Sequence, residues 1–228
     1  MASNEMKTGS MYFASRDQAG KLLAEKLAAD YRYENCAVVA LSDSSVMVAA
    51  EIAISLHSVL TMLMSSPIVL PREPNALAAV SQEGTLTYNQ EYSTGDLEEL
   101  REEYRNLIDQ QRFQLTHEMN RLIGDGGLIS KDLLKGHNVI LVSDGLKSGF
   151  SLDVAADFLK PISIEKLIIA TPIASVPAVD HMHIMADEIV CLSVASDYIE
   201  TDHYYETNDQ PDHEAVIAMI KSVILNWK

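Results

Sequence analysis

The sequence is poor in basic residues. Among its 228 residues, 17 are Lys or Arg and 33 are Asp or Glu, which gives a formal net charge of −16 at pH 7. Proteins bind nucleic acid largely through Lys and Arg contacts to phosphates, so this balance makes DNA or RNA a poor partner. The shortage is greatest over residues 167–220, where neither Lys nor Arg occurs. We expect this stretch to present an acidic surface.

Cysteine is scarce as well. The chain has two, Cys36 and Cys191, and each lies inside a short apolar run. Two cysteines are too few for the disulfide framework of a small secreted domain, and a free cysteine in apolar surroundings behaves as a small hydrophobic residue. We therefore expect both thiols to be buried and unreactive.

Long hydrophobic runs and targeting signals are also missing. The best candidate for a membrane span, residues 46–64, is interrupted by Glu51 and His57 and falls short of a clean stretch of about 20 apolar residues. The first ten residues lack a basic segment followed by an apolar one, which is the pattern of a secretory signal. The sequence thus predicts a cytoplasmic protein with no membrane partner.

Hydrophobic residues nonetheless make up 47% of the chain, which excludes a disordered protein. Short apolar, β-branched runs alternate with helical patterns, as in βαβ units that build a parallel sheet covered on both faces. Strands are predicted over residues 37–41, 59–64, 138–142, 166–170 and 188–192. Helices are predicted over residues 16–30, 47–56, 152–159 and 212–227, the last with Asp212 as its N-cap. The predicted fold class is α/β, a parallel sheet flanked by helices.

Residues 65–130 depart from this alternation. Several prolines and a short strand-like run over residues 85–88 are followed by apolar residues at helical spacing over residues 96–122. This pattern predicts a flap, or hood, with one long amphipathic helix, ending at Asp125-Gly126-Gly127. We expect a single domain over residues 1–228 that carries this insertion. The apolar stripe of the helix suits core or dimer surface, so a homodimer is the expected assembly.

One segment carries chemistry. Residues 140–151 form an apolar strand, an acid at Asp144, a turn of small residues and the start of a helix. Backbone amides at such a turn and the positive end of the helix dipole suit a phosphate, and Lys147, Ser148 and Ser151 add donors. Asp144 could accept hydrogen bonds from sugar hydroxyls or hold a magnesium ion. The simpler alternative is a turn that caps a helix, with Lys147 in solvent.

With this segment the chain resembles the type I phosphoribosyltransferases, whose loop for 5-phosphoribosyl 1-diphosphate (PRPP) follows an apolar strand. The resemblance covers nearly the whole chain, through motifs that occur in the family's order: Arg16-Asp17-x-Ala19-Gly20-x-x-Leu23-Ala24, Ala50-Glu51-Ile52-Ala53, Pro74-Asn75-x-Leu77-Ala78-x-Val80, Thr171-Pro172-Ile173-Ala174, Asp187-Glu188-Ile189-Val190-Cys191-Leu192, Tyr204-Tyr205-Glu206 and Asp212-His213-Glu214. It implies the type I phosphoribosyltransferase-like fold.

The resemblance also implies roles for the residues of the loop. Those that would bind the 5'-phosphate are Gly145, Lys147, Ser148, Gly149 and Ser151. Ser143 and Asp144 would lie against the ribose, with Asp144 as the catalytic residue. Magnesium would be the cofactor if the protein is active, and no residue is assigned to a resident metal.

Three departures from the family's pattern concern the diphosphate. Ser143 stands where the family has a second acid, Asp43 lies in the loop that is otherwise rich in Gly with an Arg, and Ser65-Ser66 replaces an Arg-Lys pair. A carboxylate near an anion disfavours it, and missing cations weaken turnover more than binding. Asp43 is interpreted as an ordinary turn acid or a repurposed magnesium ligand. The expected function is binding of PRPP or a nucleotide, without efficient transfer.

Two other functions stay open. The first is an active, divergent phosphoribosyltransferase that uses PRPP and magnesium, with the missing cations supplied by Arg72 or a partner subunit. The second is a non-catalytic scaffold or interaction subunit. An acid-rich stretch also holds His181, His183, His203 and His213, and Asp202-His203 or His181-x-His183 could ligate a transition metal. Their spacing matches no structural zinc site, so we interpret the four as surface histidines.

Overall fold

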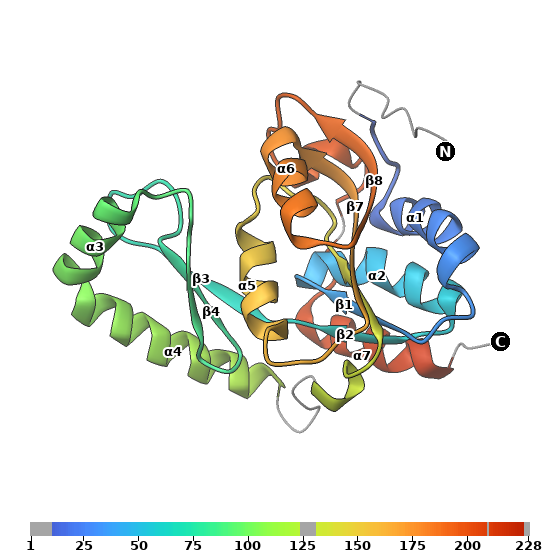
Figure 1. Ribbon diagram of the computed structural model, residues 1–228, viewed down its shortest axis with the longest axis horizontal. Coiled ribbons are helices and arrows are strands. Elements are labelled where there is room, and N and C mark those ends of the chain that lie inside the picture. The colour runs from blue at the N-terminus through green and yellow to red at the C-terminus, as the bar shows by residue number, and fades with distance from the viewer. Residues whose placement is uncertain (1–10, 124–130, 209, 226–228) are drawn as a thin grey trace. The chain divides into compact units, whose positions relative to one another are not determined.

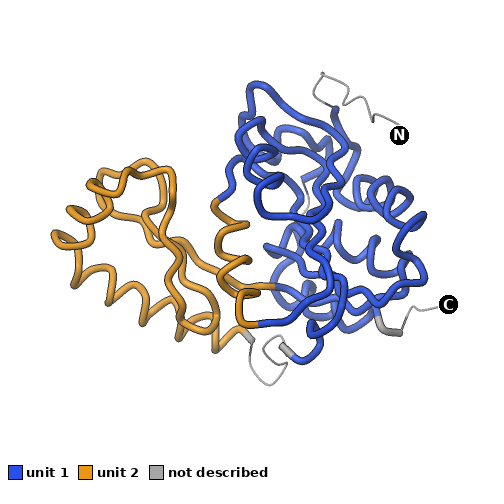
Figure 2. The backbone as a smooth tube through the Cα atoms, in the orientation of Figure 1, with its two compact units in different colours: residues 1–62, 129–149, 162–228 blue, residues 63–128, 150–161 orange. Residues whose placement is uncertain are grey.

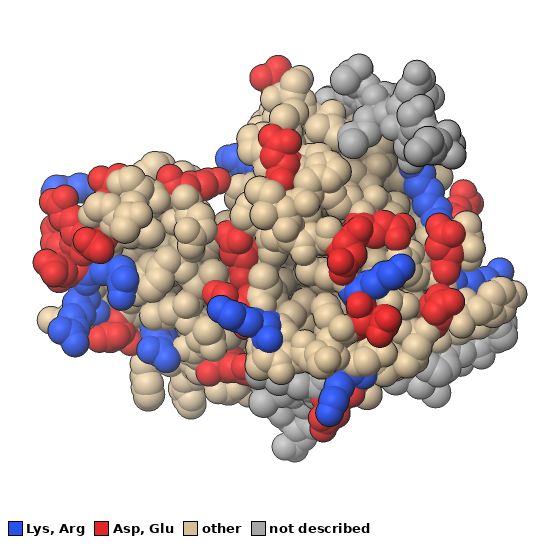
Figure 3. All heavy atoms as spheres, viewed as in Figure 1, with Lys and Arg blue, Asp and Glu red and all other residues tan. Residues whose placement is uncertain are grey.

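The computed structural model describes residues 11–123, 131–208 and 210–225. The chain forms two compact units (Figure 2), and neither is continuous in sequence. Unit 1 comprises residues 1–62, 129–149 and 162–228, and unit 2 comprises residues 63–128 and 150–161. In the described ranges no helix is long and apolar enough to cross a membrane. Acidic side chains are spread over the face shown in Figure 3, with fewer basic ones between them, in keeping with the negative net charge.

Unit 1 is built on a five-stranded sheet in the order β2-β1-β6-β7-β8, and every neighbouring pair is parallel. The strands are β1 (Cys36–Ala40), β2 (Val59–Met62), β6 (Asn138–Val142), β7 (Lys166–Ser175) and β8 (Glu188–Ala195). All five residues of β1 and of β6 are buried, as expected for central strands of a sheet covered on both faces. The predicted α/β class with a parallel sheet flanked by helices is therefore confirmed.

The helices of unit 1 pack on this sheet and on one another (Figure 1). They are α1 (Arg16–Tyr31), α2 (Asp43–Leu56), α6 (Val176–Met185) and α7 (His213–Leu225), with the short 3-10 helices η2 (Lys131–Leu133) and η3 (Thr201–Tyr204). Helix α1 lies against α2, β7 and β8, while α6 lies against β7 and β8. Asp212 caps α7 as predicted, because its Oδ1 accepts a hydrogen bond from the amide of Ala215 at 2.8 Å.

Two elements of unit 1 are longer than predicted, and both changes affect the site. Helix α2 begins at Asp43 instead of residue 47, because the hydroxyl of Ser42 accepts the amide of Ser45 and caps the helix. Strand β7 continues past Ala170 to Ser175, where it pairs with β8 and forms an isolated bridge with Leu146 in place of β6. Pro172 is tolerated there because the partner on its other side, β6, has ended at Val142.

The described part of unit 2 contains a three-stranded antiparallel sheet in the order β3-β4-β5 and three α-helices. The elements are β3 (Ser65–Ile68), β4 (Ala78–Ser81), β5 (Leu86–Tyr88), α3 (Thr94–Glu103), α4 (Arg105–Ile123) and α5 (Phe150–Leu159). The insertion predicted over residues 65–130 overlaps this unit, which also takes in α5. Its predicted end at Asp125-Gly126-Gly127 lies outside the described residues.

The amphipathic segment predicted over residues 96–122 is divided into two helices, of which α4, with 19 residues, is the long one. The break falls at Tyr104, which has φ −105° and ψ 18° and so leaves the helical region. Leucines of both helices and Tyr104 itself pack against the cluster of Ile68, Leu70 and Leu77. The break therefore lets two helices of different direction bury their apolar residues in one core.

Candidate functional site

The turn that follows β6, residues 143–149, is fixed along the extended end of β7. Leu146 forms a parallel bridge to Ala174, with its amide donating to the Ile173 carbonyl at 3.0 Å. The amide of Ser175 donates to the Leu146 carbonyl at 2.8 Å, and the Ser175 hydroxyl donates to the Lys147 carbonyl at 2.7 Å. These bonds give the turn a defined conformation before any ligand binds.

Asp144 lies at the base of this turn and is almost wholly buried. Its carboxylate accepts a hydrogen bond from Arg16 Nε at 2.8 Å and another from the Ser45 hydroxyl at 2.9 Å, and 8% of its side chain is exposed. Its backbone carbonyl accepts the Tyr205 hydroxyl at 2.5 Å. The predicted ribose acid is thus brought into an internal network that joins α1, α2 and the end of β6.

Arg16 is the centre of that network. The first residue of α1, it has 1% of its side chain exposed, and its Nη2 pairs with Asp202 at 2.5 Å. Its Nη1 donates to Asn208 Oδ1 at 3.2 Å, and the guanidinium lies 4.5 Å from the centre of the Tyr205 ring. Burial on its own would lower the pKa of Arg16, but the two carboxylates raise it above its usual value. The guanidinium therefore stays charged beside Asp144.

Ser143 and Gly145 are also engaged within unit 1. The Ser143 hydroxyl donates to the Gly145 carbonyl at 2.9 Å and accepts the Gly145 amide at 3.3 Å. A Cβ on Gly145 would collide with the Tyr198 hydroxyl and the Thr201 side chain. Gly145 thus permits the close approach of the segment around η3, a steric role different from the predicted contact to phosphate.

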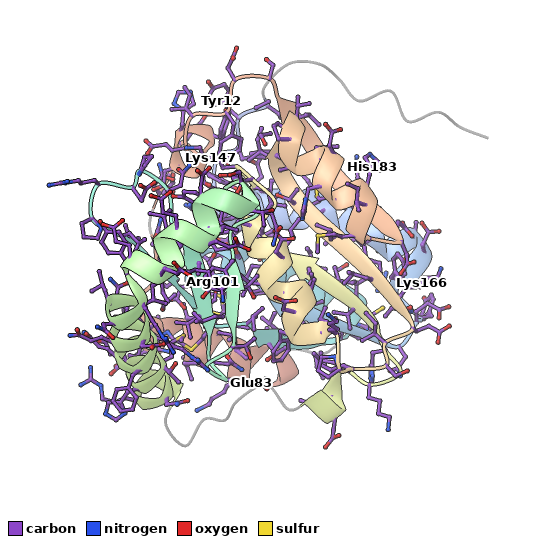
Figure 4. All side chains as sticks on the ribbon, turned by 60° about the vertical axis from the view of Figure 1, so that its left-hand side comes forward. Tyr12, Glu83, Arg101, Lys147, Lys166 and His183 are labelled. Atoms are coloured by element: carbon purple, nitrogen blue, oxygen red, sulfur yellow. The ribbon has the colours of Figure 1, made fainter. Side chains whose placement is uncertain are left out.

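The remaining turn residues face outward more than Asp144 does. Lys147 is exposed (Figure 4), and Ser148 and Gly149 are half-buried. Within the described part of the chain, the backbone amides of Lys147 and Gly149 donate to no protein acceptor. A Cβ on Gly149 would lie 2.8 Å from His181 Nε2 and still closer to two ring carbons, so the His181 ring rests on this glycine.

The predicted phosphate residues are therefore divided between the units. Gly145, Lys147, Ser148 and Gly149 belong to unit 1, whereas Ser151 lies in the first turn of α5 in unit 2.

The loop after β1 is the start of α2, where three serine hydroxyls lie close together. Ser42 Oγ is 2.6 Å from Ser45 Oγ and 3.1 Å from Ser44 Oγ, and Ser45 leads on to Asp144. Asp43, in the first turn of α2, pairs with Nδ1 of His213 at 3.2 Å. A carboxylate is favoured at a helix N-terminus, so both the start of α2 and the His213 ring stabilise the Asp43 side chain.

The four histidines have different surroundings. His183 and His203 are exposed, as predicted, and His203 Nε2 lies 3.0 Å from the Tyr12 hydroxyl. His181 and His213 are only partly exposed, so these two lie at the surface with half-buried side chains. Among the described residues, no three His, Cys, Asp or Glu side chains converge as a metal site would require.

Arg16, Ser45 and Tyr205 are the site residues for which sequence reasoning gave no role. Arg16 and Asp144 are separated by 128 positions and Ser45 and Asp144 by 99, so no local pattern joins them. Arg16 and Tyr205 do occur in the motifs that resemble phosphoribosyltransferases. Their position in these motifs is the sequence signal that could have identified Arg16 and Tyr205 as site residues.

Comparison with known proteins agrees with this architecture. Residues 11–206 match the family described as the phosphoribosyl transferase domain. A Mycobacterium tuberculosis protein named "Putative phosphoribosyl transferase" is 25% identical over 213 residues, which cover 91% of this chain and 46% of that protein. The chain therefore spans about half the length of the curated relatives it matches. The crystal structure of TT1426 from Thermus thermophilus superposes with a TM-score of 0.69 at 27% identity, covering 95% of this chain and 99% of that one.

Proposed function

Because the chain belongs to the phosphoribosyl transferase domain family, we propose that it binds a 5'-phosphorylated ribose compound, such as PRPP or a nucleotide, at the turn of residues 143–149. The observation that supports this proposal is the set of donors in the turn. Among the described residues the backbone amides of Lys147 and Gly149 donate to no protein acceptor, and the side chain of Lys147 adds an exposed ammonium group. Unpaired backbone amides and a cation in one short turn suit a phosphate dianion.

Asp144 is the proposed acceptor for the ribose hydroxyls. An ionised carboxylate offers about four lone-pair directions, and Arg16 and Ser45 use two of them. The hydrogen bonds from Arg16 and Ser45 fix the direction of the remaining lone pairs of the carboxylate. In this proposal Arg16 and Ser45 are positioning residues, while Asp144 is the one that contacts the sugar.

We propose that transfer chemistry is weak or lost. A departing diphosphate needs positive charge, and the start of α2 presents Asp43 instead. Magnesium fits poorly as well: Ser143 replaces an acid, and the charge of Asp144 is already balanced by Arg16. No step is therefore assigned to a metal. The chemistry of these residues favours a ligand-binding member of the family.

The test is calorimetric titration with PRPP, ribose 5-phosphate and AMP, each with and without magnesium. Lys147→Ala should weaken every ligand by about 10-fold to 100-fold, because a charge-assisted contact contributes about 1.5 to 3 kcal/mol. Lys166→Ala is the matched control, since Lys166 is an exposed lysine at the first residue of β7. Its removal changes the net charge equally and should leave affinity within twofold.

The other two functions predict different results. Binding of PRPP that requires magnesium and greatly exceeds that of AMP would support an active transferase and contradict the loss of the diphosphate site. Absence of binding across the panel would leave only the scaffold function. Equal weakening by both lysine variants would show that attraction is diffuse and that Lys147 is outside the site.

A further inference from the structure

Helix α4, the long helix of unit 2 in Figure 1, presents one row of exposed side chains along its surface. Residues four apart on a helix are neighbours on that surface. In one such row of α4 every member is exposed, and we call it the outer ridge: Asp109, Phe113, His117 and Arg121. Ile108 and Met119 project from the other side of the helix and are buried within unit 2. The apolar residues of α4 that form the core are therefore distinct from its outer ridge.

The side chains of the outer ridge have no partners within the chain. Phe113 is 79% exposed, and a single exposed apolar residue is common on protein surfaces. Here, however, it lies between an acid and a base that are both unpaired. Among the described residues, neither Asp109 nor Arg121 forms an ion pair or a hydrogen bond. The ridge thus offers an aromatic ring and two opposite charges to another molecule.

The outer ridge is complementary to itself in reverse order. Towards the C-terminus it runs from an acid through two aromatic rings to a base. With a twofold axis midway between Phe113 and His117, these two rings of different copies face each other, and Asp109 of each copy faces Arg121 of the other. A twofold interface is isologous, so each contact occurs twice. Rows of residues four apart also pack together in the commonest class of helix–helix contact.

The charge of the chain limits where two copies can meet. At a net charge of −16, the copies repel each other over much of their surface. Helix α4 carries three Arg against one Asp and one Glu, so it has a net positive charge. Helix α3, in contrast, carries five acids and one Arg, and residues 167–220 contain no basic residue. A contact through α4 therefore avoids like-charge repulsion that other surfaces would impose.

We propose that α4 is the surface through which two copies of this chain associate, with their outer ridges packed in antiparallel order. Phe113 and His117 form the centre of the contact. The charge pairs at its ends set the register, because exposed pairs contribute little to affinity and more to orientation. The proposal goes beyond the phosphate site and does not require it.

The size of the helix indicates the strength of the dimer. A helix of 19 residues is about 28 Å long and about 10 Å wide, so one side of it offers less than the about 800 Å² per partner of a standard interface. We therefore expect a weak, reversible dimer with a micromolar dissociation constant.

Sedimentation velocity of the whole protein over a range of concentrations measures this equilibrium. Phe113→Ser should raise the dissociation constant at least tenfold, because the centre of the contact loses its apolar ring. The residue is exposed, so the variant should fold. The control is Tyr33→Ser, which removes an aromatic residue of unit 1 that is 94% exposed and should change the constant less than twofold.

Charge exchange tests the register. Asp109→Arg and Arg121→Asp should each weaken the dimer at least tenfold, because like charges then face each other twice. The double variant Asp109→Arg/Arg121→Asp restores both pairs with their signs exchanged and should return the constant to within threefold of the unaltered protein. Glu25→Arg, at an exposed position of α1, changes the net charge as much as Asp109→Arg does and should change the constant less than twofold.

Three results would overturn the proposal. A protein that stays monomeric at every concentration would leave the outer ridge to a different partner or to solvent. A dimer that Phe113→Ser does not weaken would place the contact elsewhere. A double charge variant no stronger than the single ones would show that Asp109 and Arg121 do not face each other.

Discussion

Arg16 and Asp144 form a charge pair that is almost wholly removed from water, with 1% and 8% of their side chains exposed. Taking two charges out of water is costly, and the pair is stable only if its remaining donors and acceptors are satisfied. The Ser45 hydroxyl donates a further hydrogen bond to the carboxylate, and Asp202 and Asn208 accept hydrogen bonds from the guanidinium. Loss of Arg16 leaves Asp144 as a buried charge without an ion-pair partner, and loss of Asp144 leaves the buried guanidinium with Asp202 as its one carboxylate among these residues.

We predict that Asp144→Asn lowers the free energy of unfolding by about 3 to 5 kcal/mol, because Arg16 keeps its charge in a buried position. Ser45→Ala removes one hydrogen bond to the same carboxylate and should cost about 1 kcal/mol. Urea unfolding followed by circular dichroism measures both. Equal, small losses in the two variants would contradict a stabilising role for the ion pair. The comparison also shows whether lost ligand binding in Asp144→Asn reflects the site or the fold.

The sequence analysis located the turn of residues 143–149 but not the residues that hold Asp144 in place. Asp144 and Lys147 are visible because they follow a buried strand directly, so that a local pattern is sufficient. The pairing with Arg16 joins residues 128 positions apart, so it is a property of the complete fold. The hydroxyl of Ser143 donates to the Gly145 carbonyl, a detail of backbone geometry that residue type does not determine, and the role of Ser143 at the ribose stays a prediction.

At the level of elements, Gly20 of α1 lies directly against the backbone of α2. A Cβ on Gly20 of α1 would lie 2.7 Å from the Val48 carbonyl oxygen and 3.0 Å from Glu51 Cβ on α2. The carbonyl belongs to the helix backbone and cannot rotate away. Gly20 therefore fixes the distance between the two helices, whose first residues bring Arg16 and Ser45 to the site.

Gly20→Ala should destabilise the protein by about 1 to 3 kcal/mol through overpacking. The control is Gly95→Ala in α3, where the nearest atom to the new Cβ is the Ser93 hydroxyl at 4.0 Å. Alanine is the better helix former, so this second change should gain up to about 1 kcal/mol. Thermal unfolding should show a lower melting temperature for Gly20→Ala and a higher one for Gly95→Ala. A harmless Gly20→Ala would mean that the two helices can separate freely.

The success of the sequence analysis differed among the elements for physical reasons. The strand over residues 138–142 was predicted with the bounds observed for β6, since a strand buried on both faces is a continuous apolar run. The end of β7 was missed because Pro172 is typical of a loop. The break at Tyr104 was missed because the apolar spacing continues through it. Helix α6 was not predicted at all.

For the molecule as a whole, buried thiol and phenol groups make the folded state less stable at high pH. Burial raises the pKa of Cys36 and that of Cys191, each from 9.0 to about 11, and it raises the pKa of Tyr198 from 10.0 to about 12. Between the unfolded and folded values, the unfolded chain has released these protons while the folded chain retains them. Stability is therefore fully present below pH 9 and is lost as the pH rises towards 11 and beyond.

We predict that the free energy of unfolding, measured in urea at pH 8.0 and at pH 10.5, falls over this interval. In Cys36→Ala the fall should be smaller by on the order of 2 kcal/mol, because one buried thiol no longer resists ionisation. The variant will be less stable at both values, so the comparison concerns the slope alone. A slope identical to that of the unaltered protein would show that Cys36 ionises freely in the folded state.

The interrupted path of the chain through unit 1 also governs its folding during synthesis. Strand β1 must pair with β6, yet residues 63–128 of unit 2 are made between them. At about 5 to 20 residues per second, the nascent β1 edge waits on the order of 5 to 20 seconds for its neighbour. During that time the unpaired apolar edge of β1 can form hydrogen bonds with other chains. Most of the residues of unit 2, in contrast, have already been synthesised. On the ribosome, the parallel sheet is therefore completed only after the segments of unit 2 have been made, although its first strand precedes them in the chain.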